Sequence, residues 1–196
     1  MHGTEVVEAI PSLPSPTSGG GQDGARPMTS AAKSAAGLRP FLPGDTPLLA
    51  EIFRASIAEL TTDDYTEAQQ AAWMASAGDE ATFGARLAGE LTLVATVDGA
   101  AVGFAALKGA DVIDMLYVHP AVVGQGIGAQ LCDALEKLAA ARGATTLTAD
   151  ASDTALGFFT RHGFVPQRRN SVPRDDEWLT NTTVQKTLSA TSARTP

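Results

Sequence analysis

An apolar strand, a glycine-rich loop and an amphipathic helix follow one another in residues 111–131, and this order constrains the fold more than any other feature. The loop carries glycines at three alternate positions, Gly124, Gly126 and Gly128. Glycines let a backbone approach a ligand closely, and the N–H groups that open a helix favour negative charge. The segment therefore predicts an anion site, most naturally for a phosphate or a pyrophosphate.

The chain before this loop alternates with a period of two. Residues 91–97, 102–107 and 112–118 read as strands, and Asp98-Gly99 is a strong hairpin turn between the first two. The pattern predicts a three-stranded antiparallel meander. After the loop, apolar residues at helical spacing lead to Gly143 and then to a strand at 145–149. A helical crossover makes this fifth strand parallel to its predecessor.

The remaining segments complete one α/β domain. A short strand is expected at residues 38–41, and Asp45 can cap the helix that follows. Further helices are expected from about Thr66, over 79–88, and from Ser152 or Asp153 to His162; two last strands are expected over 164–172 and 181–188. Residues 1–36 are rich in Pro, Gly, Ser, Thr and Ala and predict a disordered leader. The domain is expected over 37–188, with a frayed tail over 189–196.

Composition limits the functional class. The 196-residue chain has a formal net charge of −8, which disfavours a nucleic-acid surface and suits a cationic substrate such as an amine. Its one cysteine, Cys132, excludes an intrachain disulfide. No apolar run approaches the roughly 20 residues that span a bilayer, and no secretory signal is present. We expect a cytoplasmic protein without a metal site or a membrane partner.

A dinucleotide site is one alternative for the loop. Residues Gly124–Ala129 fit the pattern G-x-G-x-x-A, and Asp150 ends the next strand. Dinucleotide-binding folds open with a parallel βαβ unit, however, whereas here an antiparallel meander precedes the loop. A nicotinamide-dependent oxidoreductase therefore remains only an alternative interpretation.

Two sequence motifs, one at the glycine loop and one after it, can be compared with known families. The first is Leu-Tyr-Val-His-Pro, residues 116–120, followed by a loop and G-x-G-x-G opening a helix. The second is AxxFFxxxGF, from Ala155 to Phe164. Together these motifs resemble the GNAT acyltransferase superfamily. The resemblance covers about residues 38–188, and the stretch from Phe53 to Trp73 resembles the YafP-type subgroup.

This resemblance implies a mixed, mostly antiparallel sheet that splays between its fourth and fifth strands, with acetyl-CoA as co-substrate. The family's pyrophosphate-binding pattern begins with Gln or Arg, where this chain has Val123. The pantetheine of the cofactor is expected to pair with the end of the fourth strand like an added β-strand. The residues expected at the cofactor are Leu116, Tyr117, Val118, Val123, Gly124, Gln125, Gly126, Ile127, Gly128, Ala129, Ser152 and Phe159.

The implied reaction is direct attack of an amine on a thioester, which calls for a base and an acid. Asp114 and His119 are candidate bases, although Asp114 could also be a cross-strand partner and His119-Pro120 a simple turn. Many relatives have a tyrosine acid at the position of Phe159, which cannot donate a proton. The acid would then be Tyr117 or Tyr65, or the thiolate would take its proton from water or from the product.

The acceptor is expected between the early helices and the late strands. Tyr65, Gln69 and Trp73 are spaced to share one helix face and could line that pocket, although Trp73 could instead pack on the sheet. We expect acetyl transfer to a primary amine of a small molecule. The alternatives are a protein amine as acceptor, or a CoA-binding sensor or partner-binding domain without turnover. A homodimer through the terminal strands is possible.

Overall fold

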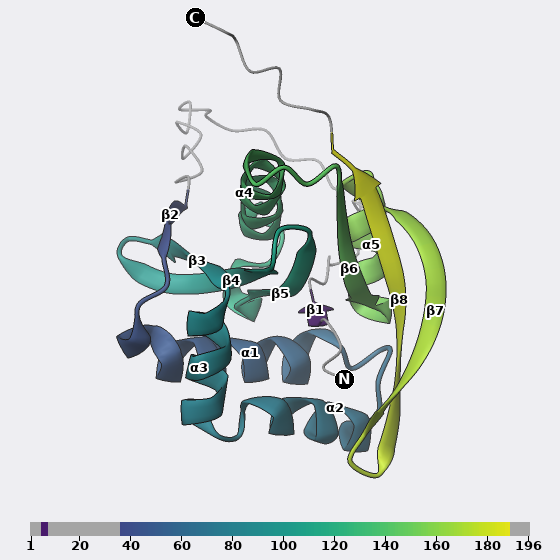
Figure 1. Cartoon of the computed structure of the whole chain (residues 1–196). Helices are drawn as coiled ribbons and strands as arrows, with labels where there is room; N and C mark the ends of the chain where they lie inside the picture. Colours follow the sequence, from purple (N-terminus) through teal and green to yellow (C-terminus); the bar gives the residue numbers. More distant parts are fainter. Residues whose placement is uncertain (1–4, 8–35, 189–196) are drawn as a thin grey trace, which may run out of the picture.

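A computed structural model describes residues 5–7 and 36–188, which fold around one sheet (Figure 1). Within these residues the sheet has eight strands in the order β2-β3-β4-β5-β1-β6-β8-β7. The strands are β1 Glu5–Val7, β2 Gly37–Pro40, β3 Leu91–Val97, β4 Ala100–Lys108, β5 Val112–Val118, β6 Thr146–Ser152, β7 Val165–Arg174 and β8 Glu177–Thr187. The helices are α1 Thr46–Leu60, α2 Glu67–Met74, α3 Glu80–Gly89, α4 Ile127–Ala141 and α5 Asp153–Arg161, with short 3₁₀ turns at Pro43–Asp45, Ala75–Ala77 and Pro120–Val122.

The sheet confirms the predicted topology. Strands β2 to β5 pair antiparallel, and Asp98 and Gly99 both have positive φ in the predicted hairpin turn. Helix α4 then crosses over, so that β6 runs parallel to β5. Strands β8 and β7 complete the sheet in antiparallel pairing beyond β6. The result is the expected mixed, mostly antiparallel sheet.

Helices cover both faces of the sheet (Figure 1). Side chains of α1, α2 and α3 pack in one cluster that includes Phe53, Phe104 and Tyr117. Side chains of α4 and α5 pack in a second cluster on the opposite face, which includes Leu131 and Phe159. Successive residues of a strand point to opposite faces, so each central strand contributes to both clusters.

Strands β5 and β6 separate soon after they pair. They are hydrogen-bonded partners only near Val112↔Thr148 and Ile113↔Ala149, which confirms the predicted splay. Beyond this point β1 lies between them, parallel to both. We call the opening between Met115–Val118 of β5 and Asp150–Ser152 of β6 the slot.

The strand β1 corrects one prediction. Residues 1–36 were expected to be disordered, but Glu5–Val7 form a strand inside the sheet. Three residues are too short a run to show a period, so sequence patterns could not reveal them. The other predictions for residues 1–4, 8–35 and 189–196 lie outside the described residues.

Two details near the first helices also differ from expectation. Asp45 precedes α1 but makes no side-chain cap; its carboxylate instead pairs with Arg39 at 2.7 Å and accepts from the Leu42 N–H. Tyr65 does not lie on a helix, because Thr66 is the N-cap and α2 begins at Glu67. The side chain of Thr66 accepts from the Gln69 N–H, which sets the start of that helix.

Gly103 of β4 brings α4 close to the sheet. A Cβ atom at Gly103 would lie 2.9 Å from the Tyr117 carbonyl oxygen and 3.4 Å from the Ile127 side chain. The absent side chain therefore lets the first turn of α4 rest on the sheet beside the end of β5. Nothing in the neighbouring sequence distinguishes this glycine from others.

We expect Gly103→Ala to lower the free energy of unfolding by about 1–3 kcal/mol, because the added methyl group overpacks this contact. Urea unfolding monitored by circular dichroism measures the change. Gly44→Ala is the matched control, because a Cβ atom there meets nothing within 4 Å and no positive φ opposes it. Equal midpoints for both variants would contradict the close approach.

Candidate active site

The glycine loop ends in a helix start that no side chain caps. Gly124 and Gly126 have φ of 77° and 86°, in the left-handed region that glycine alone adopts freely. Gly126 is the N-cap of α4 and makes no side-chain cap. The first N–H groups of a helix have no carbonyl partner within it, so those of α4 face outward. A Cβ at either glycine would meet no protein atom within 4 Å, so the space beside the loop is open.

Two helices begin at the same edge of the sheet. Because β5 and β6 are parallel, α4 and α5 both start beyond the carboxyl ends of these strands, on either side of the slot (Figure 1). The positive ends of two helix dipoles thus flank one opening. This arrangement favours an anionic ligand whose remaining part extends into the slot.

The predicted cofactor residues lie along this edge. Leu116, Tyr117 and Val118 are buried in β5 and pair on one side with β4. On the other side β1 pairs with β5, through Val6↔Leu116 and Val7↔Tyr117. The edge of β5 that was expected to bind pantetheine is therefore covered by the chain itself.

The other predicted cofactor residues differ in exposure. Gly124, Gln125 and Gly126 are exposed, Val123 and Ala129 are half-buried, and Ile127 and Gly128 are buried. Ser152 caps α5 by accepting from the Ala155 N–H at 3.1 Å, as one of the two predicted caps. Phe159 is fully buried between the rings of Phe158 and Phe164. The exposed backbone of the loop, and not these buried side chains, is what a ligand can reach.

Asp114 lies in a buried ion pair. The strands shift register here, with Ala106 opposite Met115 and Leu107 opposite Ile113, so Asp114 is the extra residue of a β-bulge. Its carboxylate is 1% exposed and accepts from Arg86 of α3, with the nearest nitrogen at 2.6 Å. A carboxylate that is buried in this way cannot contact an acceptor amine while α3 stays packed on the sheet.

Glu90, at the end of α3, shares the environment of Asp114. Burial and the nearby Asp114 carboxylate together raise the pKa of Glu90 to about 7, although the charges of Arg86 and Lys108 lower it. Within the described residues, Asp114 Oδ1 and Glu90 Oε2 are buried acceptors that lack a donor. A proton on Glu90 supplies that donor and links the two carboxyl groups. The sequence gives no signal that Arg86 and Glu90 belong to this site, because α3 and β5 meet only in the fold.

His119 forms part of a turn, which is the second of the two interpretations that the sequence left open for it. It precedes the 3₁₀ turn Pro120–Val122, and its Nδ1 accepts from the Ala121 N–H at 3.2 Å. A neutral imidazole that accepts at Nδ1 carries its proton on Nε2. In this state the ring has no free nitrogen lone pair for an amine proton.

The two candidate tyrosine acids are buried. Tyr117 packs on the α1 side of the sheet, with its ring 4.6 Å from Phe53 and 5.5 Å from Phe104. The Tyr65 hydroxyl donates to the Thr180 carbonyl at 2.6 Å and accepts from the Asp153 N–H at 3.0 Å. Burial raises the pKa of Tyr65 to about 12. Tyr65 thus connects α5 and β8 to the segment before α2.

Gln69 and Trp73 stabilise the same corner. Gln69 donates to the Trp178 carbonyl of β8 at 2.8 Å, and the Trp73 ring contacts Tyr65 edge-on at 5.3 Å. Trp73 is 3% exposed, so it packs in the core, as its alternative interpretation had it. Its Nε1 is a buried donor without an acceptor in the described part of the chain. The three residues predicted to bind the acceptor do lie together, but they mainly hold α2 against β8.

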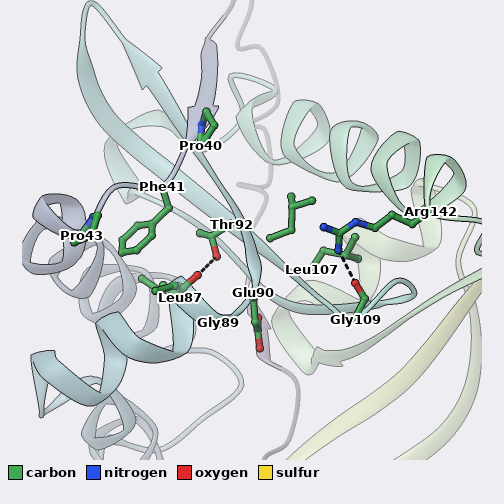
Figure 2. Close-up of a pocket in the computed structure, with 12 residues that line it drawn as sticks. Pro40, Phe41, Pro43, Leu87, Gly89, Glu90, Thr92, Leu107, Gly109 and Arg142 are labelled. Atoms are coloured by element: carbon green, nitrogen blue, oxygen red, sulfur yellow. Dashed lines mark hydrogen bonds between the residues drawn. The ribbon is translucent and has the colours of Figure 1, made fainter.

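A separate pocket of about 610 Å³ lies at the far end of α4 (Figure 2). Figure 2 shows Phe41 and Arg142 on opposite sides of it, with Arg142 donating to the Gly109 carbonyl at 2.8 Å. Arg142 follows the last residue of α4, and a 15-residue helix is about 22 Å long. The pocket is therefore remote from the glycine loop and the slot.

The described residues show two further absences. No helix among them is long and apolar enough to cross a membrane. Nor do three or more His, Cys, Asp or Glu side chains gather anywhere in residues 5–7 and 36–188 in a way that could hold a metal ion.

Known proteins resemble the chain in sequence and in fold. The model of the family described as "Acetyltransferase (GNAT) domain" matches residues 61–188, more than half of the chain. The uncharacterized N-acetyltransferase YafP of Escherichia coli is 32% identical over 144 residues, which are 74% of this chain and 91% of YafP.

Solved structures agree. A GCN5-related N-acetyltransferase from Rhodopseudomonas palustris, also described as an aminotransferase of class II, is 57% identical, with a TM-score of 0.79 over 82% of this chain and 100% of that one. The PaiA N-acetyltransferase of Thermoplasma acidophilum, solved with coenzyme A, shares the fold at 18% identity, with a TM-score of 0.64 over 78% of this chain and 99% of that one.

The raised pKa of Glu90 predicts how stability depends on pH. The unfolded chain releases the Glu90 proton near the ordinary pKa of 4.5, whereas the folded chain keeps it up to about 7. The free energy of unfolding should therefore fall by roughly 1–2 kcal/mol between these pH values, after allowance for partial exposure. Urea unfolding at several pH values measures it. Glu90→Gln should flatten this part of the curve, and an unchanged slope would refute the assignment.

Proposed function

The chain belongs to the GNAT acetyltransferase family, and on that premise we propose that it transfers an acetyl group from acetyl-CoA to a primary amine of a small molecule. One observation carries the proposal: the uncapped start of α4 and its left-handed glycines stand at the edge where β5 and β6 separate. A pyrophosphate suits that helix start, and an extended pantetheine suits the slot.

The residues of the loop fit coenzyme A by their backbone. Val123 replaces the Gln or Arg of the family pattern and removes one side-chain contact. The N–H groups of Ile127, Gly128 and Ala129 stand at the first turn of α4 and do not depend on that side chain. The relative PaiA is solved with coenzyme A, which supports the same use of the shared fold here.

Acetyl-CoA supplies an activated acyl group. The amine nitrogen bonds to the thioester carbon and the C–S bond breaks; the amine gives one proton to water, and the CoA thiolate takes one proton from water. The chain's own residues bind and orient the reactants. Holding two reactants together in the right geometry is itself a large source of rate. The loop and the edge of β5 are suited to hold the donor for that purpose.

Proton transfer through water fits the geometry better than transfer through a side chain. Asp114 is committed to Arg86, His119 to the Ala121 N–H, and Tyr65 to two backbone groups. We therefore propose that the acceptor amine loses its proton to water, and that Asp114 acts by fixing the bulge of β5. The same geometry favours one other function, a CoA-binding sensor without turnover, because no described candidate is poised as a base.

The acidic character of the chain supports a small cationic acceptor. The net charge of −8 attracts amines over long range, and Asp63 and Asp64 lie at the loop before α2, on the side of the slot where Tyr65 contacts α5. A protein amine is the alternative acceptor.

We expect Gly126→Glu to weaken binding of coenzyme A at least tenfold, because it places a carboxylate where the pyrophosphate is proposed to bind. Titration calorimetry against CoA, acetyl-CoA and NAD measures it. Gly143→Glu is the matched control, since Gly143 has nearly the same φ of 87° and lies at the other end of α4. It should leave affinity within twofold.

If the wild type binds no CoA, the proposed function is wrong, and binding of NAD instead would support the oxidoreductase. Equal losses in both variants would show that strain alone, and not the added charge, weakens binding.

The rate of CoA release with different amines tests which class of acceptor the protein uses. We expect release of free CoA from acetyl-CoA to rise at least tenfold above the acceptor-free rate with a small aliphatic diamine, and less with a peptide that has a free N-terminus. The rate should increase with pH as the amine loses its proton. A thiol-reactive dye follows the reaction. Stronger stimulation by the peptide would favour a protein acceptor, and CoA binding without any stimulation would favour the sensor.

A further inference from the structure

The slot is filled by the chain's own strand β1. Val6 is paired on one side with Leu116 of β5 and on the other with Ala151 of β6, so the segment closes the gap in the sheet (Figure 1). The three residues Glu5–Val7 are opposite Met115–Tyr117 in parallel register. Their backbone uses the N–H and C=O groups on the edge of β5 that faces β6.

An extended ligand in the slot would need the same groups. Residues 116–118 of β5 have their other edge fully used by β4, through Ala105↔Leu116, Phe104↔Tyr117 and Gly103↔Val118. Only the edge that faces β6 can accept an added strand. A pantetheine and β1 therefore cannot bind Leu116 and Tyr117 at the same time.

We propose that Glu5–Val7 is a built-in competitor of the acyl donor, which must leave the slot before acetyl-CoA can bind. This inference rests on the function proposed for the same site. The state in which β1 is paired with β5 and β6 is then autoinhibited, and a state with an open slot binds the donor.

The expected size of the effect follows from tethering. A segment attached to the same chain competes at an effective concentration that can reach the millimolar range, even when its own contacts are few. The apparent affinity for the donor falls by the fraction of molecules with an open slot. Inhibition of threefold to tenfold corresponds to a slot that is closed in about two thirds to nine tenths of the molecules.

The direction of β1 determines how the donor meets it. Because β1 is parallel to β5, Val7 lies toward the carboxyl end of β5 and thus toward the glycine loop. A donor whose pyrophosphate binds at the loop would meet Val7 first. Displacement of β1 can thus proceed from this end while Glu5 is still paired.

Val6→Pro in the full-length chain tests the proposal. Proline has no N–H and is not tolerated in a central strand, so it should expel the segment. The expected result is a KM for acetyl-CoA lowered at least threefold with kcat unchanged, together with tighter CoA binding by calorimetry. Gly20→Pro, at a position outside the described residues, is the control and should behave as the wild type.

Hydrogen exchange gives a readout that does not depend on turnover. The amides of Val6 and Val7 should be protected in the free wild type and should lose protection when CoA is saturating. In Val6→Pro, which has no amide hydrogen at position 6, the amide of Val7 should be unprotected.

Three results would overturn the proposal. Equal KM values and equal CoA affinities in the wild type, Val6→Pro and Gly20→Pro would show that β1 does not compete with the donor. The proposed acetyltransferase function would then still stand. A higher KM in Val6→Pro would make β1 part of the donor site and not its competitor. Failure of all three proteins to bind CoA would overturn the proposed function and this inference with it.

Discussion

The separation of β5 from β6 is the feature on which the candidate site depends. The last pair that β5 and β6 share is Ile113↔Ala149, and the residue after Ile113, Asp114, is the bulged one. Its carboxylate is buried against Arg86 of α3. Removing one member of a buried ion pair leaves the other charge uncompensated at a cost of several kcal/mol, so α3 and the bulge hold each other in place. The point at which β5 and β6 separate is thus held by α3, which packs on the face of the sheet opposite to α4.

Side-chain contacts outside the slot hold its two sides in place. Gly103 lets α4 rest on β4, and Lys186 of β8 pairs with Glu136 of α4 at 2.6 Å. Across the slot, Tyr65 links the start of α5 to β8. The Lys186–Glu136 pair joins α4 to the β6–β8 side near the amino end of β6, where Lys186 is opposite Leu147, and not at the open end of the slot. The walls can therefore keep their positions whichever strand-like segment lies between them, which is what a site for an extended ligand requires.

Local patterns predicted the parts of the fold that local chemistry determines. The alternation of residues 91–118, the turn at Asp98-Gly99 and the helix after the glycine loop are visible in the sequence, and so is the crossover that makes β6 parallel to β5. The contacts of the candidate site were harder to predict from the sequence. Arg86 and Asp114 are 28 residues apart and meet only through packing of α3, so the environment of Asp114 had no sequence signal. Tyr65 was assigned to a helix face because its spacing fitted, although the cap at Thr66 excludes it.

The occupied slot changes how ligand affinity at this site should be understood. Backbone N–H and C=O groups on the edge of β5 need partners, which β1, water or an extended ligand can supply. Exchange of one such partner for another replaces hydrogen bonds by similar ones, so the slot itself contributes little net free energy to donor binding. The deciding contribution then comes from a place that β1 does not cover, namely the start of α4, where Gly126 leaves the helix uncapped. A ligand that carries both an extended arm and an anionic group can displace the strand, whereas an extended arm alone gains no advantage over it.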